Sequence, residues 1–217
     1  MELNRSPNVE RARVYRALAR LFHFPSEGLV VDLRERQVPE LRNALDRLQA
    51  DEKLLEPVAR LAKRIVDVDP RELERSYERT FEAPGDLRCF PHETAHAPEK
   101  PVEAMLSTFQ LADIAGFYRA FGVEIAPETE RVDHISAELE FMHLLAVKEA
   151  LAEAQENPEG VEICRDAARS FLRDHLGRWY PKFCSRLREA AAGPVYAAAG
   201  QLLERFLDLE ASRAAAC

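Results

Sequence analysis

The chain has 217 residues and a net charge of −8, because 30 Lys and Arg stand against 38 Asp and Glu. Hydrophobic residues make up 47%, charged residues 31%, and only 8 residues are Gly. This composition argues against a disordered chain, a β-sandwich or barrel, and a glycine-rich nucleotide-binding fold. The negative charge excludes a general field that attracts phosphate backbones, so we expect no nucleic-acid partner.

The sequence shows no membrane or export signal. No apolar run approaches the ~20 residues needed to span a bilayer, and the N-terminal residues are too polar for a signal peptide. We therefore expect a cytoplasmic protein without stable membrane insertion. The cysteines lie far apart without a CxxC pair, which predicts buried or free thiols in a reducing compartment. They are Cys89, Cys164, Cys184 and Cys217.

Apolar residues recur at helical spacing along nearly the whole chain, and no alternation typical of a strand is found. The predicted class is therefore all-α. The expected helices cover about residues 9–22, 27–35, 39–49, 54–66, 70–82, 102–121, 133–155, 161–191 and 194–213.

Several residues mark where these helices begin, bend or end. Asp69 is predicted to cap the helix that Pro70 opens, and Asp133 to cap the helix that follows it. Gly122 is predicted as a C-terminal cap. Residues 157–160 are expected to end one helix and separate it from the next. A kink is predicted near Gly177 or Pro181.

Residues 84–101 contain Pro84, Gly85, Pro91, Pro98 and Pro101, so this stretch cannot form one helix and is predicted to be an ordered loop with short turns. Loops held by rigid helices often carry function.

The loop contains His92-Glu93-x-x-His96, the spacing that binds zinc when it lies on a sustained helix. The flanking prolines leave barely two turns, so we interpret these residues as loop contacts. A di-iron interpretation pairs Glu93 and His96 with a second E-x-x-H, Glu140 and His143. It is disfavoured because the first copy lies in the loop. We expect no metal and no cofactor.

Residues 124–140 hold six acids against Arg131 alone. Glu138 lies at the edge of the apolar stripe formed by Ile135 and Met142, and it shares a helix face with His134. Such clusters are commonly solvated faces. Beside an apolar groove, however, they would suit a ligand with paired cations and an apolar extension, because guanidinium–carboxylate pairs are strong where partly desolvated.

Five segments taken in order resemble the TorD/DmsD family of redox-enzyme maturation chaperones. They are residues 77–81, 89–94, 112–118, 121–122 and 133–142, and residues 175–183 extend the resemblance, which covers about residues 14–210. The resemblance implies a TorD-like helical bundle in one domain of two packed lobes. We expect the lobes at about residues 1–122 and 133–217, with a hinge at about 123–132 that would permit helix exchange, so the protein would be a monomer or a homodimer.

The resemblance also implies a non-enzymatic role. The protein would bind the twin-arginine signal peptide, or another N-terminal segment, of a molybdopterin-containing oxidoreductase catalytic subunit, hold that subunit in its apo form until cofactor insertion, and prevent premature export. No catalytic residue is expected. The expected peptide-binding residues are Tyr77, Phe81, Pro91, Glu93, Gly122, Asp133, His134 and Glu138.

Within this set, Asp133, His134 and Glu138 are expected near the charged part of the peptide, and Tyr77, Phe81 and Pro91 to shape the groove. Two alternatives remain open. One is a metal-dependent enzyme that uses His92, Glu93, His96 and His143. The other is an assembly factor that recognises a folded surface without a signal peptide.

Overall fold

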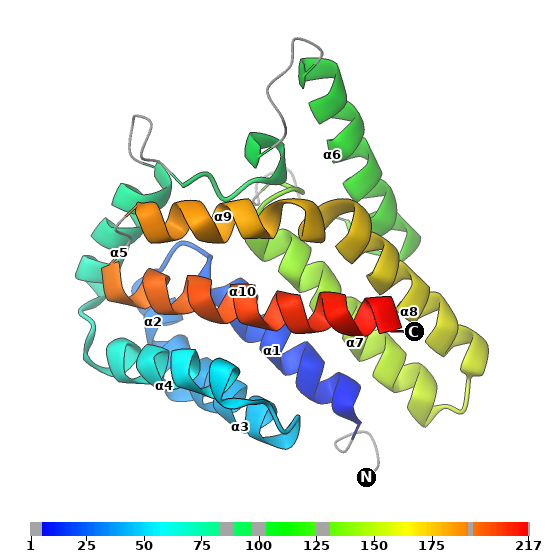
Figure 1. Cartoon of the computed structure of the whole chain (residues 1–217), viewed down its shortest axis with the longest axis horizontal. Coiled ribbons are helices and arrows are strands. Elements are labelled where there is room, and N and C mark those ends of the chain that lie inside the picture. The colour runs from blue at the N-terminus through cyan, green and yellow to red at the C-terminus, as the bar shows by residue number, and fades with distance from the viewer. Residues whose placement is uncertain (1–5, 83–88, 97–102, 125–130, 191–192, 217) are drawn as a thin grey trace.

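The computed structural model describes residues 6–82, 89–96, 103–124, 131–190 and 193–216, with the side chains of 103–106 and 216 excepted. These residues form a single helical bundle, which confirms the all-α prediction (Figure 1). None of the described helices is long and apolar enough to cross a membrane. The helices are α1 (Pro7–Leu21), α2 (Glu27–Asp32), α3 (Val38–Arg47), α4 (Glu52–Asp67), α5 (Pro70–Tyr77), α6 (Glu103–Ala120), α7 (Ile135–Ala154), α8 (Pro158–Phe171), α9 (Gly177–Glu189) and α10 (Gly193–Ala216).

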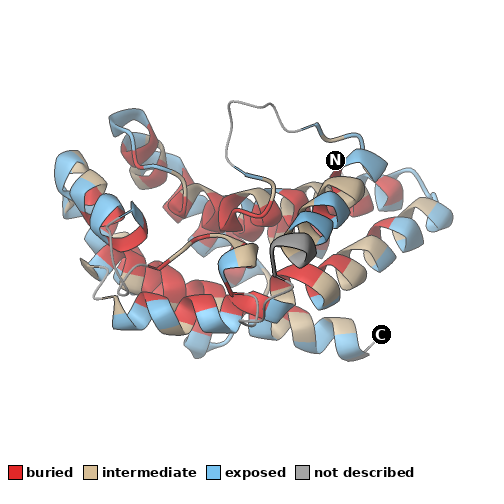
Figure 2. Ribbon diagram, turned by 90° about the horizontal axis from the view of Figure 1, so that it is seen from above, coloured by how far each residue is buried: buried red, intermediate tan, exposed pale blue. Residues whose placement is uncertain are grey.

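The bundle is organised around α1, which packs against α7, α3 and α10. α4 in turn packs against α10, and α7 against α8. Figure 2 shows buried residues concentrated on the inward faces of these helices, and α1 and α10 meet in the middle of the molecule in Figure 1. Both predicted lobes therefore contribute to one core. The predicted hinge stays a prediction, because residues 125–130 lie outside the described part of the chain.

Side-chain caps start several helices as the sequence indicates. The Asp69 carboxylate accepts hydrogen bonds from the backbone N–H groups of Arg71 and Glu72, and Pro70 occupies the first helical position of α5. This confirms the predicted cap, since proline lacks the N–H that would be unpaired there. Gly122 adopts φ +76° after α6, and its N–H donates to the Arg119 carbonyl. The predicted C-terminal cap is likewise confirmed.

The structure corrects two helix boundaries. The predicted break before residue 39 is absent, because a π-helical turn at Leu33–Gln37 joins α2 directly to α3. Residues 157–160 open α8, with Asn157 accepting a hydrogen bond from the Gly160 N–H, so only residues 155–157 separate α7 from α8.

The predicted kink lies just before Gly177, where another π-helical turn, Leu172–Leu176, joins α8 to α9. A Cβ at Gly177 would collide with the Leu172 carbonyl oxygen. Glycine therefore allows the close backbone approach that this turn requires.

Three of the four cysteines lie in the described residues, and all three are buried free thiols, as predicted. Burial raises the pKa of the Cys89 thiol to about 12. Such a thiol is unreactive at neutral pH. Cys217 lies outside the described residues.

Candidate functional site

The described part of the proline-rich loop, residues 89–96, lies against the start of α7. The Glu93 N–H donates to the Asp133 carbonyl at 2.9 Å, and the Ile135 N–H donates to the Pro91 carbonyl at 2.8 Å. These bonds form an isolated antiparallel bridge between His92 and His134. We call residues 89–96 together with residues 131–135 the loop dock. The dock brings together four of the predicted site residues, which the sequence places about 40 positions apart.

The Asp133 side chain holds the two segments of the loop dock together and has no exposed surface. Its carboxylate accepts hydrogen bonds from the Thr94 N–H at 3.2 Å and the Thr94 hydroxyl at 2.7 Å. Arg131 adds a fork to both carboxylate oxygens, at 3.0 and 3.1 Å. The predicted role of Asp133 as helix cap is wrong, because this carboxylate is engaged by the loop and by Arg131.

His134 caps α7 in place of Asp133. Its Nδ1 accepts a hydrogen bond from the Ser136 N–H at 3.2 Å and lies 2.6 Å from the Ser136 hydroxyl. The ring is 3% exposed and contacts the His92 ring edge-on, with centroids 5.1 Å apart. His134 therefore orients both the helix and the loop.

Beneath the dock lies a buried pair of acids. Glu138 has no exposed surface, and Glu93 is 3% exposed. Burial raises the pKa of Glu138 well above its usual range, and the Glu93 charge raises it further, against a hydrogen bond from Trp179 Nε1 at 3.0 Å. Burial and the neighbouring Glu93 charge therefore favour the protonated form of the Glu138 carboxyl.

His175 connects this pair to α6. Its Nδ1 lies 3.3 Å from a Glu93 carboxylate oxygen, and its Nε2 lies 3.2 Å from a carboxylate oxygen of Asp113. The Tyr118 hydroxyl of α6 donates to the Val132 carbonyl at 2.8 Å. α6 is thus tied to the segment that precedes α7, near the exposed Gly122.

Tyr77 and Phe81 are buried in an aromatic cluster that continues to the dock. Phe81 stacks on Phe183, and Phe183 contacts Trp179, with centroids 6.4 and 5.4 Å apart. Trp179 in turn stacks on His96 at 5.2 Å. Tyr77 is 5% and Phe81 2% exposed, so in this conformation both support the loop from below rather than line an open groove.

The acids between residues 124 and 140 do not form one surface patch. Asp133 and Glu138 are fully buried, whereas Glu124 and Glu140 are exposed, and Glu140 bonds with His23 at 3.0 Å. Glu128 and Glu130 lie outside the described residues. The two acids expected to meet a cationic ligand are therefore enclosed by the protein, where Asp133 accepts hydrogen bonds from Thr94 and Arg131 and Glu138 accepts one from Trp179.

Of the two histidines of the H-E-x-x-H pattern, His96 lies on a 3₁₀ turn, Glu93–His96, and His92 lies just before that turn. His96 Nε2 bonds with the Phe90 carbonyl at 2.8 Å, and burial lowers the pKa of this imidazole. His143 lies elsewhere, with Nδ1 donating to the Ala12 carbonyl at 2.8 Å. Within the described ranges, no three His, Cys, Asp or Glu side chains are placed to hold a metal ion.

Four functional neighbours were missed from the sequence. Trp179 donates to Glu138, His175 Nδ1 lies 3.3 Å from Glu93, and Thr94 and Arg131 donate to Asp133. Trp179 and His175 could have been found from the sequence, because both lie in residues 175–183, which extend the family resemblance. Nothing in the local pattern links Thr94 to an acid 39 positions away.

Comparisons with known proteins show which sequences this chain is similar to. A family model described as the nitrate reductase delta subunit matches residues 35–185. The chain is 37% identical over 100 residues to a perchlorate reductase assembly chaperone protein of Dechloromonas aromatica (strain RCB), a match that covers 45% of this chain and 43% of that protein.

Two further relatives match over 143 residues, which cover 65% of this chain and 69% of each relative. They are a chlorate reductase assembly chaperone protein of Ideonella dechloratans at 33% identity and a selenate reductase assembly chaperone protein of Thauera selenatis at 30%. The aligned part thus spans less than half of the perchlorate relative and about two thirds of the other two. Since the family model covers more than half of this chain, the chain belongs to the nitrate reductase delta subunit family, and the expected TorD/DmsD membership is confirmed.

Proposed function

We propose that this protein is a cytoplasmic assembly chaperone for the catalytic subunit of a molybdopterin-containing reductase. It binds the N-terminal segment of that subunit, including a twin-arginine signal where one is present, and keeps the apo subunit from export until its cofactor is inserted. Three relatives named as reductase assembly chaperones support the role. The observation that carries the proposal is the loop dock, in which the family-like residues of two distant segments are joined by hydrogen bonds.

Buried acids position the loop dock, whereas other residues of its loop are exposed to solvent. The side chains of Glu93, Asp133 and Glu138 are buried and contact His175, Thr94 and Trp179 respectively, so we assign these three acids to positioning the loop. On the 3₁₀ turn Ala95 is exposed and Thr94 partly exposed, and His92, just before the turn, is also partly exposed. We propose that the client's N-terminal segment lies across this turn, against the exposed end of α6 at Gly122.

This arrangement also supports a chaperone over a metal-dependent enzyme. In the H-E-x-x-H segment, His96 bonds with a backbone carbonyl and Glu93 faces His175 and Glu138. These groups serve packing of the loop, and their polar atoms are directed into the protein. A zinc enzyme needs two such histidines and an open coordination position together.

The test is affinity purification of the tagged full chain from its native cytoplasm, with mass spectrometry of the bound proteins and metal analysis of the same eluate. A reductase catalytic subunit that retains its N-terminal segment is the expected result. Stoichiometric zinc or iron without such a partner would contradict the proposal. Capture that persists after the client's N-terminal segment is deleted would instead indicate recognition of a folded surface.

A matched pair of variants locates the contact. Ala95→Arg adds a bulky cation to the exposed turn and should abolish capture, because it blocks the surface and repels arginines of the client. Ala59→Arg makes the same change at an exposed position of α4, at the far side of the bundle from the loop (Figure 1), and should leave capture intact. Equal capture by both variants would place the client elsewhere.

A further inference from the structure

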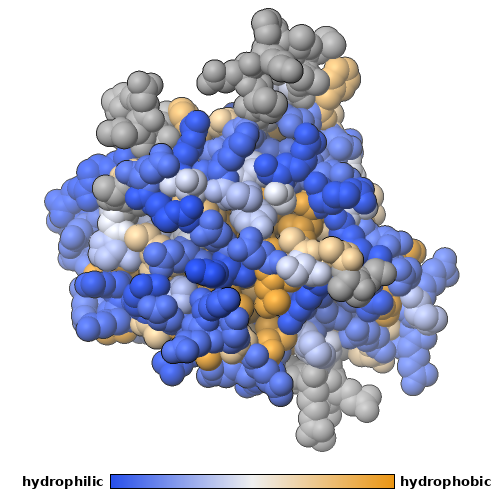
Figure 3. Space-filling model, viewed as in Figure 1, coloured by the Kyte–Doolittle hydropathy of each residue, from blue (hydrophilic) through white to orange (hydrophobic). Residues whose placement is uncertain are grey.

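A cavity of about 470 Å³ lies between α1, α7, α8 and α10, away from the loop dock. A second hollow of about 380 Å³ adjoins it near the start of α9. Both are lined by Arg169, Leu172 and Ala214, so the last turns of α10 separate two parts of one depression. Figure 3 shows apolar side chains gathered around α10 on a face that is otherwise hydrophilic.

The apolar walls of the larger cavity are aliphatic. Met142, Ala168, Leu172 and Ala214 line it, and no aromatic side chain does so among the residues that the structure describes. A volume of this size is typical of sites for small organic molecules. Walls without aromatic rings favour a flexible aliphatic chain over a heterocycle, which gains affinity by stacking.

The polar lining carries an excess of positive charge. Four arginines face two glutamates, Glu149 and Glu210, which are both buried. Arg11 bonds to both glutamates and holds them in place. The remaining arginines are Arg165, paired with Glu149; Arg213, paired with Glu210; and Arg169, whose ion-pair partners in the described structure are Glu162 and Asp166.

Arg169 is the least satisfied of the four. Its two acidic partners are 57% and 63% exposed at the side chain, so water screens these pairs. Its Nε is buried and donates no hydrogen bond within the described structure. A buried donor without an acceptor destabilises a fold unless a ligand or water supplies the acceptor.

From these observations we propose that the cavity binds an aliphatic organic anion, such as a medium-chain carboxylate. The anionic head accepts a hydrogen bond from Arg169 Nε and is balanced by the excess of guanidinium groups. The chain lies along Met142, Leu172 and Ala214. This site is independent of the client-binding surface proposed above.

Isothermal titration of the full chain tests the proposal with four probes: decanoate, the uncharged analogue decanol, inorganic phosphate and ATP. Decanoate should bind at one site at least about tenfold more tightly than decanol. Because the two probes differ only in the head group, this ratio measures what the carboxylate contributes to the affinity. Phosphate and ATP should bind more weakly than decanoate. Equal binding of decanol, or tighter binding of ATP, would overturn the assignment.

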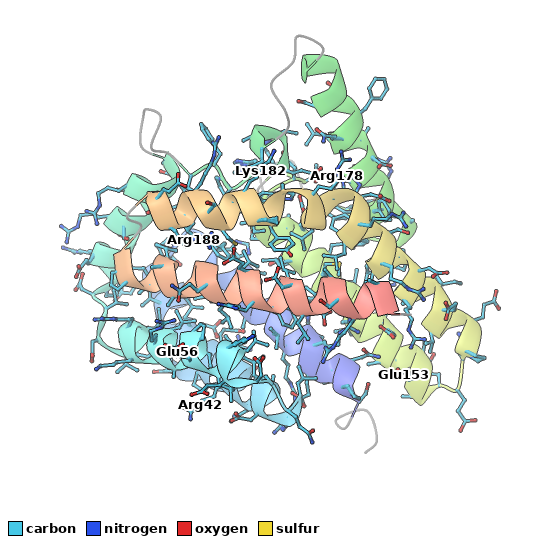
Figure 4. All side chains as sticks on the ribbon, viewed as in Figure 1. Arg42, Glu56, Glu153, Arg178, Lys182 and Arg188 are labelled. Carbon is cyan, nitrogen blue, oxygen red and sulfur yellow. The ribbon has the colours of Figure 1, made fainter. Side chains whose placement is uncertain are left out.

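Variants then locate the site, with folding checked by circular dichroism. Arg169→Gln should weaken decanoate binding about tenfold, and Arg169→Lys, which retains the charge but lacks Nε, should also weaken it. Ala168→Phe should abolish binding by filling the cavity. Arg178→Gln removes an exposed arginine of α9 outside the cavity (Figure 4) and should leave the affinity unchanged. Undiminished binding by both Arg169→Gln and Ala168→Phe would show that the anion binds elsewhere.

Discussion

Two centres of buried acids lie along α7 and are built in opposite ways. Near its first turn, Glu138 lies beside Glu93, and no Arg or Lys of the described residues pairs with either. Farther along, Glu149 and its neighbour Glu210 are held by Arg11. Burial alone thus does not decide how a carboxyl is accommodated. Its neighbours decide whether it keeps a proton or forms an ion pair.

The two centres connect different sets of helices. The Arg11 centre joins α1, α7 and α10 and holds together elements of both predicted lobes. The Glu138 centre joins the loop, α7, α9 and α6 through one tryptophan and one histidine. Arginine–carboxylate pairs hold the first centre, whereas the Trp179 hydrogen bond to Glu138 and the His175 contact with Glu93 hold the second, so salt and pH should act on them separately.

The largest loss of stability is expected for Arg11→Met, which tests the centre held by arginine–carboxylate pairs. Removal of this guanidinium leaves Glu210 and Glu149 without their shared cation, although Arg213 and Arg165 still reach them from outside. We expect a loss of about 3–5 kcal/mol in the free energy of unfolding, the range for one partner removed from a buried pair. Urea denaturation measures it.

The control is Arg36→Met, which removes an i,i+4 pair with Asp32 in which Arg36 is 48% exposed. A loss of about 0.5 kcal/mol or less is expected there. Similar losses in the two variants would mean that Arg11 acts only as a surface cation.

The second prediction concerns the loop dock itself. Asp133→Ala removes the acceptor for two Thr94 donors and for Arg131, so we expect a loss of about 2–3 kcal/mol from the lost hydrogen bonds to this buried carboxylate. Hydrogen exchange at the Thr94 amide should accelerate in parallel. Asp174→Ala, at an aspartate that is 44% exposed, should change neither quantity measurably.

These two centres also show how far sequence reasoning extends. Helix order, the Asp69 and Gly122 caps and the class of fold follow from local spacing and turn chemistry, which a sequence displays directly. The loop dock does not. Asp133 is an ordinary N-cap by local rules, and only the tertiary approach of Thr94 draws its carboxylate away from the helix end.

The complete burial of Glu138 could not be predicted from the sequence either. Its place beside the apolar stripe indicated an unusual glutamate, but its partner Trp179 lies 41 residues away in another helix. A resemblance can mark both residues without telling whether they touch a ligand or each other. Their roles became distinguishable only when exposure and hydrogen bonds were known.

The third prediction separates the centres by pH. Because the pKa of Glu138 is raised in the folded state, folded protein binds more protons than unfolded protein above the ordinary glutamate value. Stability should therefore fall as pH rises from about 4.5, by up to about 1.4 kcal/mol per pH unit, until the folded-state pKa is passed. Below about 4.5 the group is protonated in both states and adds no slope.

Glu138→Gln should remove this component, because an amide keeps the Trp179 hydrogen bond and does not titrate. Unfolding free energies measured between pH 5 and 8 provide the comparison. Glu140→Gln, two positions along at a half-exposed site, should keep the slope of the original protein. A slope that persists in Glu138→Gln would assign the proton to another group.

The smallest expected effect is at the end of α6 that adjoins the dock. Gly122 has φ +76°, and a Cβ there would meet no atom within 4 Å, so only backbone strain opposes a side chain. Gly122→Ala should destabilise the protein by about 1 kcal/mol. Gly116 lies inside α6 with equally open space, and there alanine should stabilise the helix by about 0.5–1 kcal/mol. Thermal unfolding of the two variants should therefore shift in opposite directions. If both shifted upward, Gly122 would not be held in the left-handed conformation, and the turn that leads from α6 toward the dock would be free to rearrange.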